Sequence, residues 1–350
     1  MTVLGGGVFG SAADDLTDLR SLVDDIGVRS FDARIGHRSL PDAFDATAWG
    51  HLEEAGLTRL LSTPDSGAGP AEVAVVLRSL ARHAVTVPVA ETDVLACWLA
   101  ERAGLEVPET GPLTVAADLT AVPYAADAAA VLVAQADGDG LRVAVCARAA
   151  LSATQGHNGG GEPRDAVVVD LPADAFATVE GAAAELRRRG AWARCMQVIG
   201  ALDAAVEFSV EHTRDREQFG RSLSAFQAVQ HTLAAMTGEV ERGRAAANLA
   251  VAAAAEHGFD DAATDYAVTV AKVTLGRVVP AVITSAHQLH GAIGVTIEHR
   301  LWLATMRARS WIGEFGDTAH HARRLGRLAL ATADPWDVVV GSVSESIGAG

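Results

Sequence analysis

The sequence predicts a mostly helical protein with a small β domain in the middle of the chain. Apolar residues repeat with a helical period through the first third of the chain and again after Pro172. Between these parts, from about Pro112, short valine-rich runs bounded by turn residues are typical of strands. The 350 residues, of which 49% are apolar, are enough to bury a sizeable core.

The N-terminal helical domain is predicted over residues 1–110. Two apolar stripes have the spacing of a buried helix face, and a further helix is predicted at 92–102. Turn residues such as Gly27 and Gly56 separate these segments. The stripes consist of Leu16, Leu19, Val23 and Ile26, and of Val73, Val76, Leu77 and Leu80.

The small β domain is predicted over residues 111–178. Its strands are expected within the runs 113–119, 128–135, 141–147 and 165–171. The Asp-Gly-Asp-Gly sequence at 137–140 indicates a hairpin between the second and third runs. The glycine-rich stretch 155–161 is interpreted as a flexible loop and not as a phosphate-binding loop, because no helix begins directly after it.

A C-terminal helical bundle is predicted over residues 179–334, followed by a tail at 335–350. Four long helices, at about 180–213, 222–257, 260–292 and 297–331, are expected to pack as an antiparallel bundle. The tail begins with an apolar stretch at Trp336, which we expect to pack at an interface.

Composition excludes several classes of function. A net charge of −16 argues against nucleic acid or an anionic membrane as the main partner. No apolar run is expected to reach membrane length, no secretory leader is expected, and three well-separated cysteines indicate a reduced, cytoplasmic protein. No metal site is predicted, because the pair His320–His321 lacks the i, i+4 spacing and the carboxylate that such a site needs.

A polar corner separates the first two helices of the predicted bundle. The sequence from Arg214 to Met236, RDREQFGRSLSAFQAVQHTLAAM, has cations where one helix ends, a helix-breaking Gly220 and serines that can cap the next helix. Helix termination explains the arginines and the glycine. It does not explain why Gln218 and Phe219 lie in the corner.

Here the sequence resembles the acyl-CoA dehydrogenases. The pattern R-x-Q-F-G followed by F-Q-x-V-Q-x-x-L-A-x-M is similar to that family's signature, and the downstream segment from Gln288 to Glu298, QLHGAIGVTIE, is similar to its Q-x-x-G-G-x-G-x-T-x-E segment. The family removes two hydrogens from the α and β carbons of an acyl-CoA thioester, with FAD as cofactor. The predicted order of helices, strands and helices also agrees with this family.

The resemblance implies which residues contact FAD. Arg216 and Gln218 would hold its pyrophosphate, Phe219 would pack on the cofactor, and the glutamine and glycines of the second motif would approach the adenosine end. An arginine offers a planar fork of donors to a phosphate, and glycine lets backbone N–H groups come close. In this family such motifs reach across a subunit interface. The residues of the second motif are Gln288, Gly291 and Gly294.

The catalytic base of the family is not found in register. The reaction needs a carboxylate that removes the α-proton. The family places it either shortly after the glycine motif, where this chain has Gly316 with Glu314 two residues away, or on the helix before the corner, where it has Gly190. Glu314 is therefore the candidate base in this chain, out of register, and a partner subunit is the expected source of the base.

These departures predict a subunit of a heteromeric enzyme. The family's T-E-P-x-x-G-S-D segment is absent between 112 and 124, and the β region is short, so the chain resembles the truncated partner subunits of bacterial heteromeric acyl-CoA dehydrogenases. This resemblance implies an α2β2 assembly with a related chain, α,β-desaturation of an acyl-CoA that is bulky or sterol-derived, and an electron-transfer flavoprotein as electron acceptor.

Two alternatives stay open at the level of the sequence. The chain is a self-sufficient homomeric dehydrogenase if Glu314 is the base, and it is a non-catalytic scaffold with the dehydrogenase fold if no assembly of it holds flavin. The acyl group does not follow from the sequence, because side chains distant in the chain shape the pocket.

Overall fold

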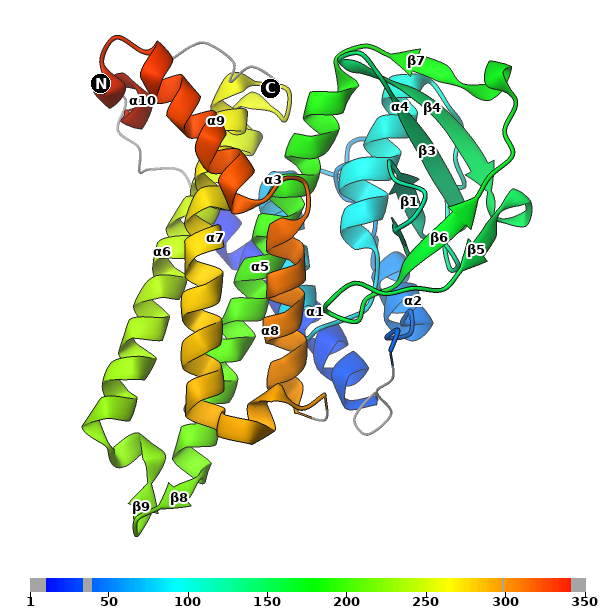
Figure 1. Cartoon of the computed structure of the whole chain (residues 1–350). Helices are drawn as coiled ribbons and strands as arrows, with labels where there is room; N and C mark the ends of the chain where they lie inside the picture. The colour runs from blue at the N-terminus through cyan, green and yellow to red at the C-terminus, as the bar shows by residue number, and fades with distance from the viewer. Residues whose placement is uncertain (1–10, 34–39, 298, 341–350) are drawn as a thin grey trace.

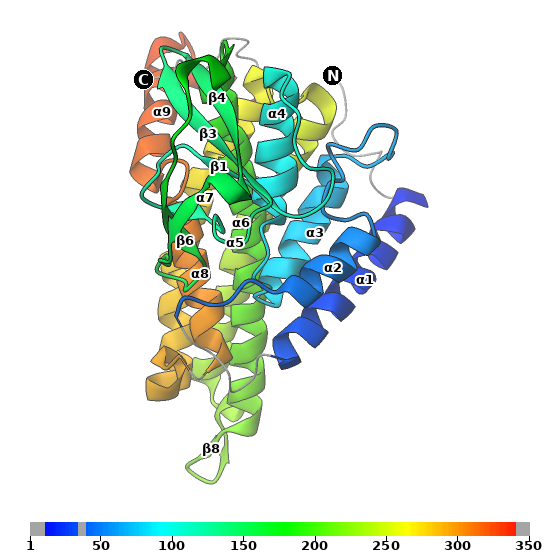
Figure 2. The same ribbon diagram turned by 90° about the vertical axis from the view of Figure 1, so that its right-hand side faces the viewer.

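The protein is described from a computed structural model that places residues 11–33, 40–297 and 299–340. Its elements follow the predicted order of N-terminal helices, a small β domain and a C-terminal bundle (Figures 1 and 2), so the predicted fold class is confirmed. The N-terminal helices are α1 (Ser11–Ala33), α2 (Ala46–Glu54), α3 (Pro70–Arg82), the π-helix η1 (Ala90–Cys97) and α4 (Trp98–Ala103).

Local sequence explains where several of these helices begin and end. The side chain of Asp45 caps α2 by accepting a hydrogen bond from the backbone N–H of Ala48 at 2.9 Å. Helix α3 begins with Pro70, whose ring presets the helical φ angle, and α4 ends at Gly104, which has a φ angle of +63°.

The predicted helix at 92–102 begins earlier than expected and is a π-helix over its first eight residues. Three consecutive polar residues at its start are buried, and each contacts a different part of the fold. Glu91 pairs with Arg194 of the bundle, the Thr92 hydroxyl bonds the backbone of Leu113, and Asp93 accepts from the backbone of residues 61 and 62. The π-helix thus joins all three parts of the molecule.

The β domain consists of two small sheets packed face to face. One sheet has the order β1-β3-β4-β7 and the other the order β2-β6-β5. The predicted hairpin is confirmed, because Asp137 pairs with Gly140 at the end of β3 and β4. The strands are β1 (Leu113–Ala116), β2 (Val122–Pro123), β3 (Ala130–Asp137), β4 (Gly140–Ala147), β5 (Ser152–Thr154), β6 (Arg164–Val168) and β7 (Ala177–Val179).

Strand β3 is apolar on both faces because each face packs against a different layer. Val131 and Val133 belong to the core between the two sheets, whereas Leu132 belongs to the large core shared with the helices. The helices and the β domain therefore share a continuous apolar interface. A cavity at this interface is lined by residues from both the helices and the β domain.

The C-terminal bundle is built from α5 (Ala182–Asp215), α6 (Gln227–His257), α7 (Ala262–His290), α8 (Arg300–Gly313) and α9 (Thr318–Ala331). The fourth predicted helix, 297–331, is wrong as a continuous helix, because a tight turn separates α8 from α9. Phe315 and Gly316 in this turn have φ angles of +55° and +96°, outside the helical range.

The stretch Ala262–Val295 is, by length and composition, apolar enough to cross a membrane, contrary to the expectation from sequence. Half of its most apolar window is buried, and α7 contacts α5, α6, α8 and α9. A core helix of a bundle meets the same criteria, so this observation is weak evidence for a membrane span.

A short helix, α10 (Pro335–Val339), forms the described start of the predicted tail, and residues 341–350 lie outside the described ranges. Trp336 on this helix is exposed.

Candidate functional site

The polar corner between α5 and α6 is a short β-hairpin with a two-residue turn. Strands β8 (Glu217–Gln218) and β9 (Arg221–Ser222) pair around Phe219 and Gly220, whose φ angles are +56° and +78°. Two consecutive positive φ angles define the turn that matches the twist of a hairpin. A short 3₁₀ turn, η4 (Leu223–Ala225), then leads into α6.

The hairpin presents an aromatic side chain at its tip. Phe219 is 89% exposed, and its ring contacts only one neighbouring ring among the described residues, that of Phe226, with centroids 6.1 Å apart. The guanidinium of Arg221 lies over Phe226, 4.1 Å from the ring centroid. Figure 1 shows the hairpin projecting from the end of the bundle that lies away from the β domain.

The second motif lies where α7 ends. Helix α7 stops at His290, Gly291 follows with a φ angle of +65°, and the 3₁₀ turn η5 (Gly291–Val295) leads toward α8. Gly294 is buried, and a Cβ atom there would lie 2.7 Å from the Cβ of His290. Because glycine has no Cβ atom, η5 can pack closely against the end of α7. Glu298, the last residue of the motif, lies outside the described residues.

The two motifs, some 70 residues apart in the sequence, meet in one groove of about 640 Å³, which we call the corner groove. Arg216, Gln218, Gln288 and Gly291 line it, as the sequence predicts for a shared site, whereas Phe219 and Gly294 lie outside its lining. Within the described chain, the side chains of its arginine and two glutamines form no hydrogen bond or ion pair. Three exposed polar groups without partners are thus available to a ligand.

Two histidines that the sequence did not predict as site residues also line the corner groove. His212, one turn before Arg216 on α5, stacks on His290 with ring centroids 4.4 Å apart. The only sequence signal was the position of His290 inside the second motif. The partner ring comes from another helix, so the pair could not be found from spacing.

A second hollow, the interdomain cavity, lies between the β domain and the bundle. Its volume is about 510 Å³, and apolar side chains form much of its wall. Its charged groups include Glu91, Arg164, Arg194 and Glu314, which are drawn from four different elements or turns. The wall is completed by Leu95, Val115, Ala117, Asp118, Ala121, Pro123, His157, Asn158, Leu186 and Phe315.

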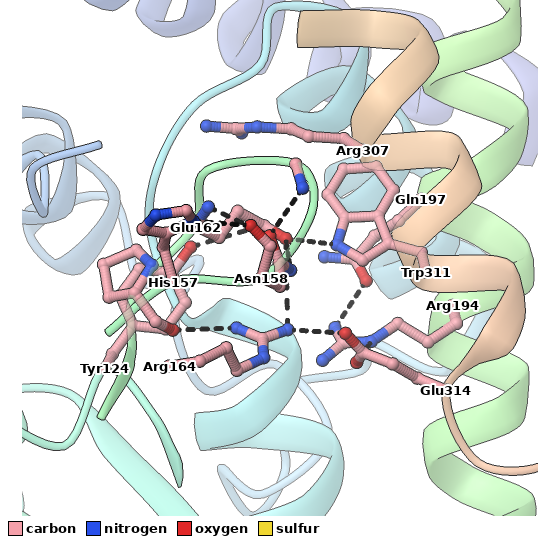
Figure 3. Close-up of polar contacts among 12 residues, drawn as sticks. Tyr124, His157, Asn158, Glu162, Arg164, Arg194, Gln197, Arg307, Trp311 and Glu314 are labelled. Carbon is pink, nitrogen blue, oxygen red and sulfur yellow. Dashed lines mark hydrogen bonds and ion pairs between the residues drawn. The ribbon is translucent and has the colours of Figure 1, made fainter. Parts of the chain in front are cut away.

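Both carboxylate oxygens of Glu314 are occupied by arginines (Figure 3). Its Oε1 accepts from Arg164 at 2.8 Å and its Oε2 from Arg194 at 2.7 Å. Burial by itself would raise the pKa of this carboxyl, but the charges of Arg194 and Arg164 outweigh it and lower the pKa to about 2. A carboxylate this acidic and doubly bonded is a weak acceptor for a substrate proton.

Phe315, which lines this cavity, contacts one of the two sequence positions at which the family places its base and directly precedes the other. Gly190 on α5 faces the ring of Phe315, and a Cβ atom at Gly190 would lie 2.3 Å from the ring's Cε1 atom. Phe315 directly precedes Gly316, the position that aligns with the family's acid. The ring of Phe315 therefore occupies the space beside Gly190, and neither of the two positions carries a carboxylate.

Hydrogen bonds from a lysine of α7 also fix the turn that carries Glu314. Lys272 of α7, a buried lysine, donates from Nζ to the carbonyl oxygens of Ile312 and Glu314, each at 2.7 Å. These carbonyls lie at the C-terminal end of α8, where a cation is favourable. Burial lowers the pKa of Lys272 to about 8.

The glycine-rich stretch 155–161 is a folded connection and not the flexible loop expected from the sequence. Asn158 accepts from the backbone N–H groups of Gly160 and Glu162 and donates to the Glu162 carboxylate. The indole Nε1 of Trp311 on α8 donates to the same carboxylate at 2.7 Å (Figure 3). Glycine at 160 is required by space, because a Cβ atom there would lie 2.9 Å from the Cα of Arg307.

Residues 183–329 match the family model described as the acyl-CoA dehydrogenase C-terminal domain. Together with the fold, this match confirms the resemblance predicted from the sequence. FAD is the cofactor of this family of oxidoreductases, and a glutaryl-CoA dehydrogenase from Mycobacterium smegmatis has been solved in complex with FADH2.

Particular relatives resemble most of the chain. Acyl-CoA dehydrogenase IpdE2 of Mycolicibacterium smegmatis is 27% identical over 301 residues, which cover 81% of this chain and 88% of that protein. The ChsE4-ChsE5 complex from Mycobacterium tuberculosis contains a chain that aligns with a TM-score of 0.77 at 23% identity, covering 91% of this chain and 97% of that one. A chain of the Tcur3481-Tcur3483 steroid ACAD G363A variant aligns with a TM-score of 0.76 at 24% identity, covering 91% and 98%. At these identities the two structures establish the fold.

Proposed function

We propose that the chain is one subunit of a heteromeric flavin-dependent acyl-CoA dehydrogenase and that its corner groove binds the FAD held by a related partner chain. The convergence of Arg216, Gln218, Gln288 and Gly291 on one exposed groove carries this proposal. The guanidinium of Arg216 suits the two negative charges of a pyrophosphate, and the glutamines offer both donors and acceptors to a nucleotide.

The position of the groove supports a role in another subunit. The hairpin and η5 lie at the end of the bundle away from the β domain (Figure 1), whereas the interdomain cavity adjoins the β domain. A residue such as Phe219, exposed at a projecting tip, suits contact with a second chain better than contact with its own.

The interdomain cavity supports the absence of a base in this chain. Glu314 is ion-paired through both oxygens, and Phe315 fills the space beside Gly190. Four charged side chains of the cavity wall are already bonded to one another, namely Glu91, Arg164, Arg194 and Glu314. We therefore place the catalytic carboxylate in the partner.

The reaction of the assembly is then α,β-desaturation of an acyl-CoA. Bound FAD would supply the hydride acceptor for the β carbon, and the partner's base would take the α-proton. This chain's residues fix the cofactor: Arg216 holds the pyrophosphate, Gln218 and Gln288 orient the nucleotide, and Phe219 packs at the interface.

Further parts of the proposal concern the cellular setting. We propose an α2β2 assembly, a cytoplasmic location, an electron-transfer flavoprotein as acceptor, and a bulky, sterol-derived acyl group. The fold likeness to a chain of the ChsE4-ChsE5 complex supports the heteromer, and the likeness to a chain of the Tcur3481-Tcur3483 steroid ACAD supports the acyl class.

Two arginines at the C-terminal end of α5 test the proposal. In the co-expressed complex, Arg216→Ala is expected to lower bound flavin at least tenfold, because a charge-assisted phosphate contact is lost. Arg214→Ala, an exposed arginine two residues away that does not line the corner groove, is the matched control and is expected to keep full flavin. Unchanged flavin in Arg216→Ala would favour the scaffold alternative.

The homomeric alternative has a test of its own. If Glu314 were the base, the chain purified alone would be yellow and active, and Glu314→Gln would abolish turnover while keeping flavin. We expect the lone chain to be colourless.

A further inference from the structure

Beside the corner groove lies a cluster of three imidazoles from three different elements. His212 belongs to α5, His290 ends α7, and His299 precedes α8. The ring centroids of His290 lie 4.4 Å from His212 and 5.0 Å from His299, and those of His212 and His299 lie 6.5 Å apart. These contacts are close enough that a proton on one ring is felt by the other two.

The hydrogen bonds fix the neutral form of two of the rings. Nδ1 of His290 lies 2.8 Å from the carbonyl oxygen of Ala286, which can only accept, so this nitrogen carries the proton. Nδ1 of His299 accepts from the backbone N–H of Leu301 at 3.1 Å, so its proton lies on Nε2. In the neutral cluster, Nε2 of His290 is then a buried lone pair with no hydrogen-bond partner in the described structure.

A proton on that nitrogen is opposed by burial and favoured by the backbone. The pKa of His290 is lowered to about 4, mainly by burial and to a smaller extent by the neighbouring His212 and His299, while the backbone at Ala286 and Phe208 acts in the opposite direction. Burial, and then the charge of Arg216, also lower the pKa of His212.

Among the described residues that line the hollow beside the cluster, positive and negative side chains are equal in number. Glu211 of α5 and Arg300 of α8 form an ion pair, and both line a smaller hollow that adjoins the cluster. Asp215 and Arg216 lie at the end of α5, in the same hollow. His212 and Arg216 line both this hollow and the corner groove, so charge on the cluster acts directly on a ligand in the groove.

We propose that the cluster of His212, His290 and His299 couples proton uptake to binding of a dinucleotide pyrophosphate in the corner groove. The proposal rests on the proposed function of the groove. The ligand's two negative charges favour a proton on the cluster, so binding takes up a proton and strengthens as the pH falls from 7.5 to 5.5. A gain of about three- to tenfold in affinity is expected for one added charge at partly solvated distance.

FAD titrated into the flavin-stripped complex of this chain and its co-expressed partner is the test. The two phosphates of FAD keep their charges across this range, so the ligand's phosphates do not contribute to the pH dependence. Calorimetry at pH 6.0 in two buffers of different ionisation enthalpy counts the protons taken up. The wild-type complex is expected to take up a measurable fraction of a proton per FAD, up to about half a proton for a tenfold coupling.

A triple variant removes the titration and keeps the packing. His212→Gln keeps a polar side chain, His290→Phe keeps a stacking ring, and His299→Asn keeps an oxygen that can cap α8. The variant is expected to lose most of the proton uptake and the pH dependence of the dissociation constant. His231→Gln, an exposed histidine on α6 that does not line the groove, is the matched control.

Equal proton uptake by wild type and triple variant overturns the inference. If the triple variant does not fold, the single variant His212→Gln is the test, because the half-buried ring of His212 lines both the corner groove and the smaller hollow. Proton uptake by His212→Gln equal to that of wild type also overturns the inference.

The variant Arg216→Ala distinguishes failure of the proton coupling from failure of the proposed function. If it leaves FAD affinity unchanged, the groove is not the cofactor site and the proposed function fails. If it weakens FAD while the histidine variants do nothing, only the proton coupling fails.

Discussion

Single residues in this protein are governed by the partners that tertiary structure brings to them. Glu314 illustrates this: the sequence made it the candidate base, and its contacts with Arg164 and Arg194 suit a structural carboxylate. Those arginines are 150 and 120 residues away in the chain. A buried arginine left without its carboxylate is costly, so the effect of substitution falls first on stability.

Glu314→Gln is expected to destabilise the chain by about 2–3 kcal/mol, because two buried guanidiniums lose a shared anion. Urea denaturation of the lone chain measures this loss, and Asp317→Asn, on an exposed carboxylate in the same turn, is the control. An unchanged unfolding midpoint for Glu314→Gln would contradict the structural role.

The same carboxylate predicts an acid-dependent loss of stability. The pKa of Glu314 in the folded chain is about 2, below the ordinary value of 4.5. Its contribution is therefore complete above pH 4.5 and is lost as the pH falls toward 2. The difference in unfolding free energy between wild type and Glu314→Gln should shrink over this range. A constant difference would show that the ion pairs carry little energy.

The lowered pKa of His290 predicts a second pH range, above that of Glu314, in which the chain loses stability. Its folded pKa of about 4 lies below the ordinary 6.5, so the folded chain resists protonation and loses stability as the pH falls from 6.5 toward 4. His290→Phe is expected to flatten this part of the stability profile, measured by denaturation at half-unit pH steps. An equally steep profile in His290→Phe would mean that other groups cause the loss.

At the scale of elements, two tight turns hold the two functional regions in place. The hairpin presents Phe219 in a left-handed conformation that a non-glycine residue adopts at a cost of about 1 kcal/mol. The α8–α9 turn packs Phe315 into the space left by Gly190. Each turn keeps an aromatic side chain in a strained or crowded place, and each prediction below follows from one of them.

Phe219→Gly is expected to stabilise the lone chain by about 1 kcal/mol, because glycine adopts a positive φ angle without penalty. The same change is expected to weaken flavin retention in the complex, because the exposed ring is lost from the interface. Thermal unfolding of the lone chain and flavin content of the complex test the two effects separately. A gain in stability with no loss of flavin would assign Phe219 no role in assembly.

Gly190→Ala is expected to destabilise the chain by about 1–3 kcal/mol through overlap with the ring of Phe315. A double-mutant cycle with Phe315→Ala isolates that contact. The loss caused by Gly190→Ala should be much smaller when the ring is already absent. Additive effects would mean that the two residues do not contact each other as described.

At the scale of the whole molecule, the interdomain cavity and the corner groove differ in how far their polar groups are already paired. The interdomain cavity is lined by charged groups that are bonded to each other, whereas the corner groove exposes polar groups without partners. A subunit that completes a neighbour's site would have this distribution. The absorption spectrum of the lone chain should therefore lack flavin bands, and the co-expressed complex should show them.

The sequence by itself determined the order of helices and strands and the β3–β4 hairpin, because these depend on local periodicity and turn chemistry. The resemblance of two short motifs to a family singled out four residues that line the corner groove. The break between α8 and α9 was missed, because apolar spacing continues across a turn that is set by packing against Gly190 and Lys272. The role of Glu314 and the histidine cluster were decided only by tertiary structure. Ion pairing and ring stacking depend on distances between groups far apart in the chain, and only the packed fold sets those distances.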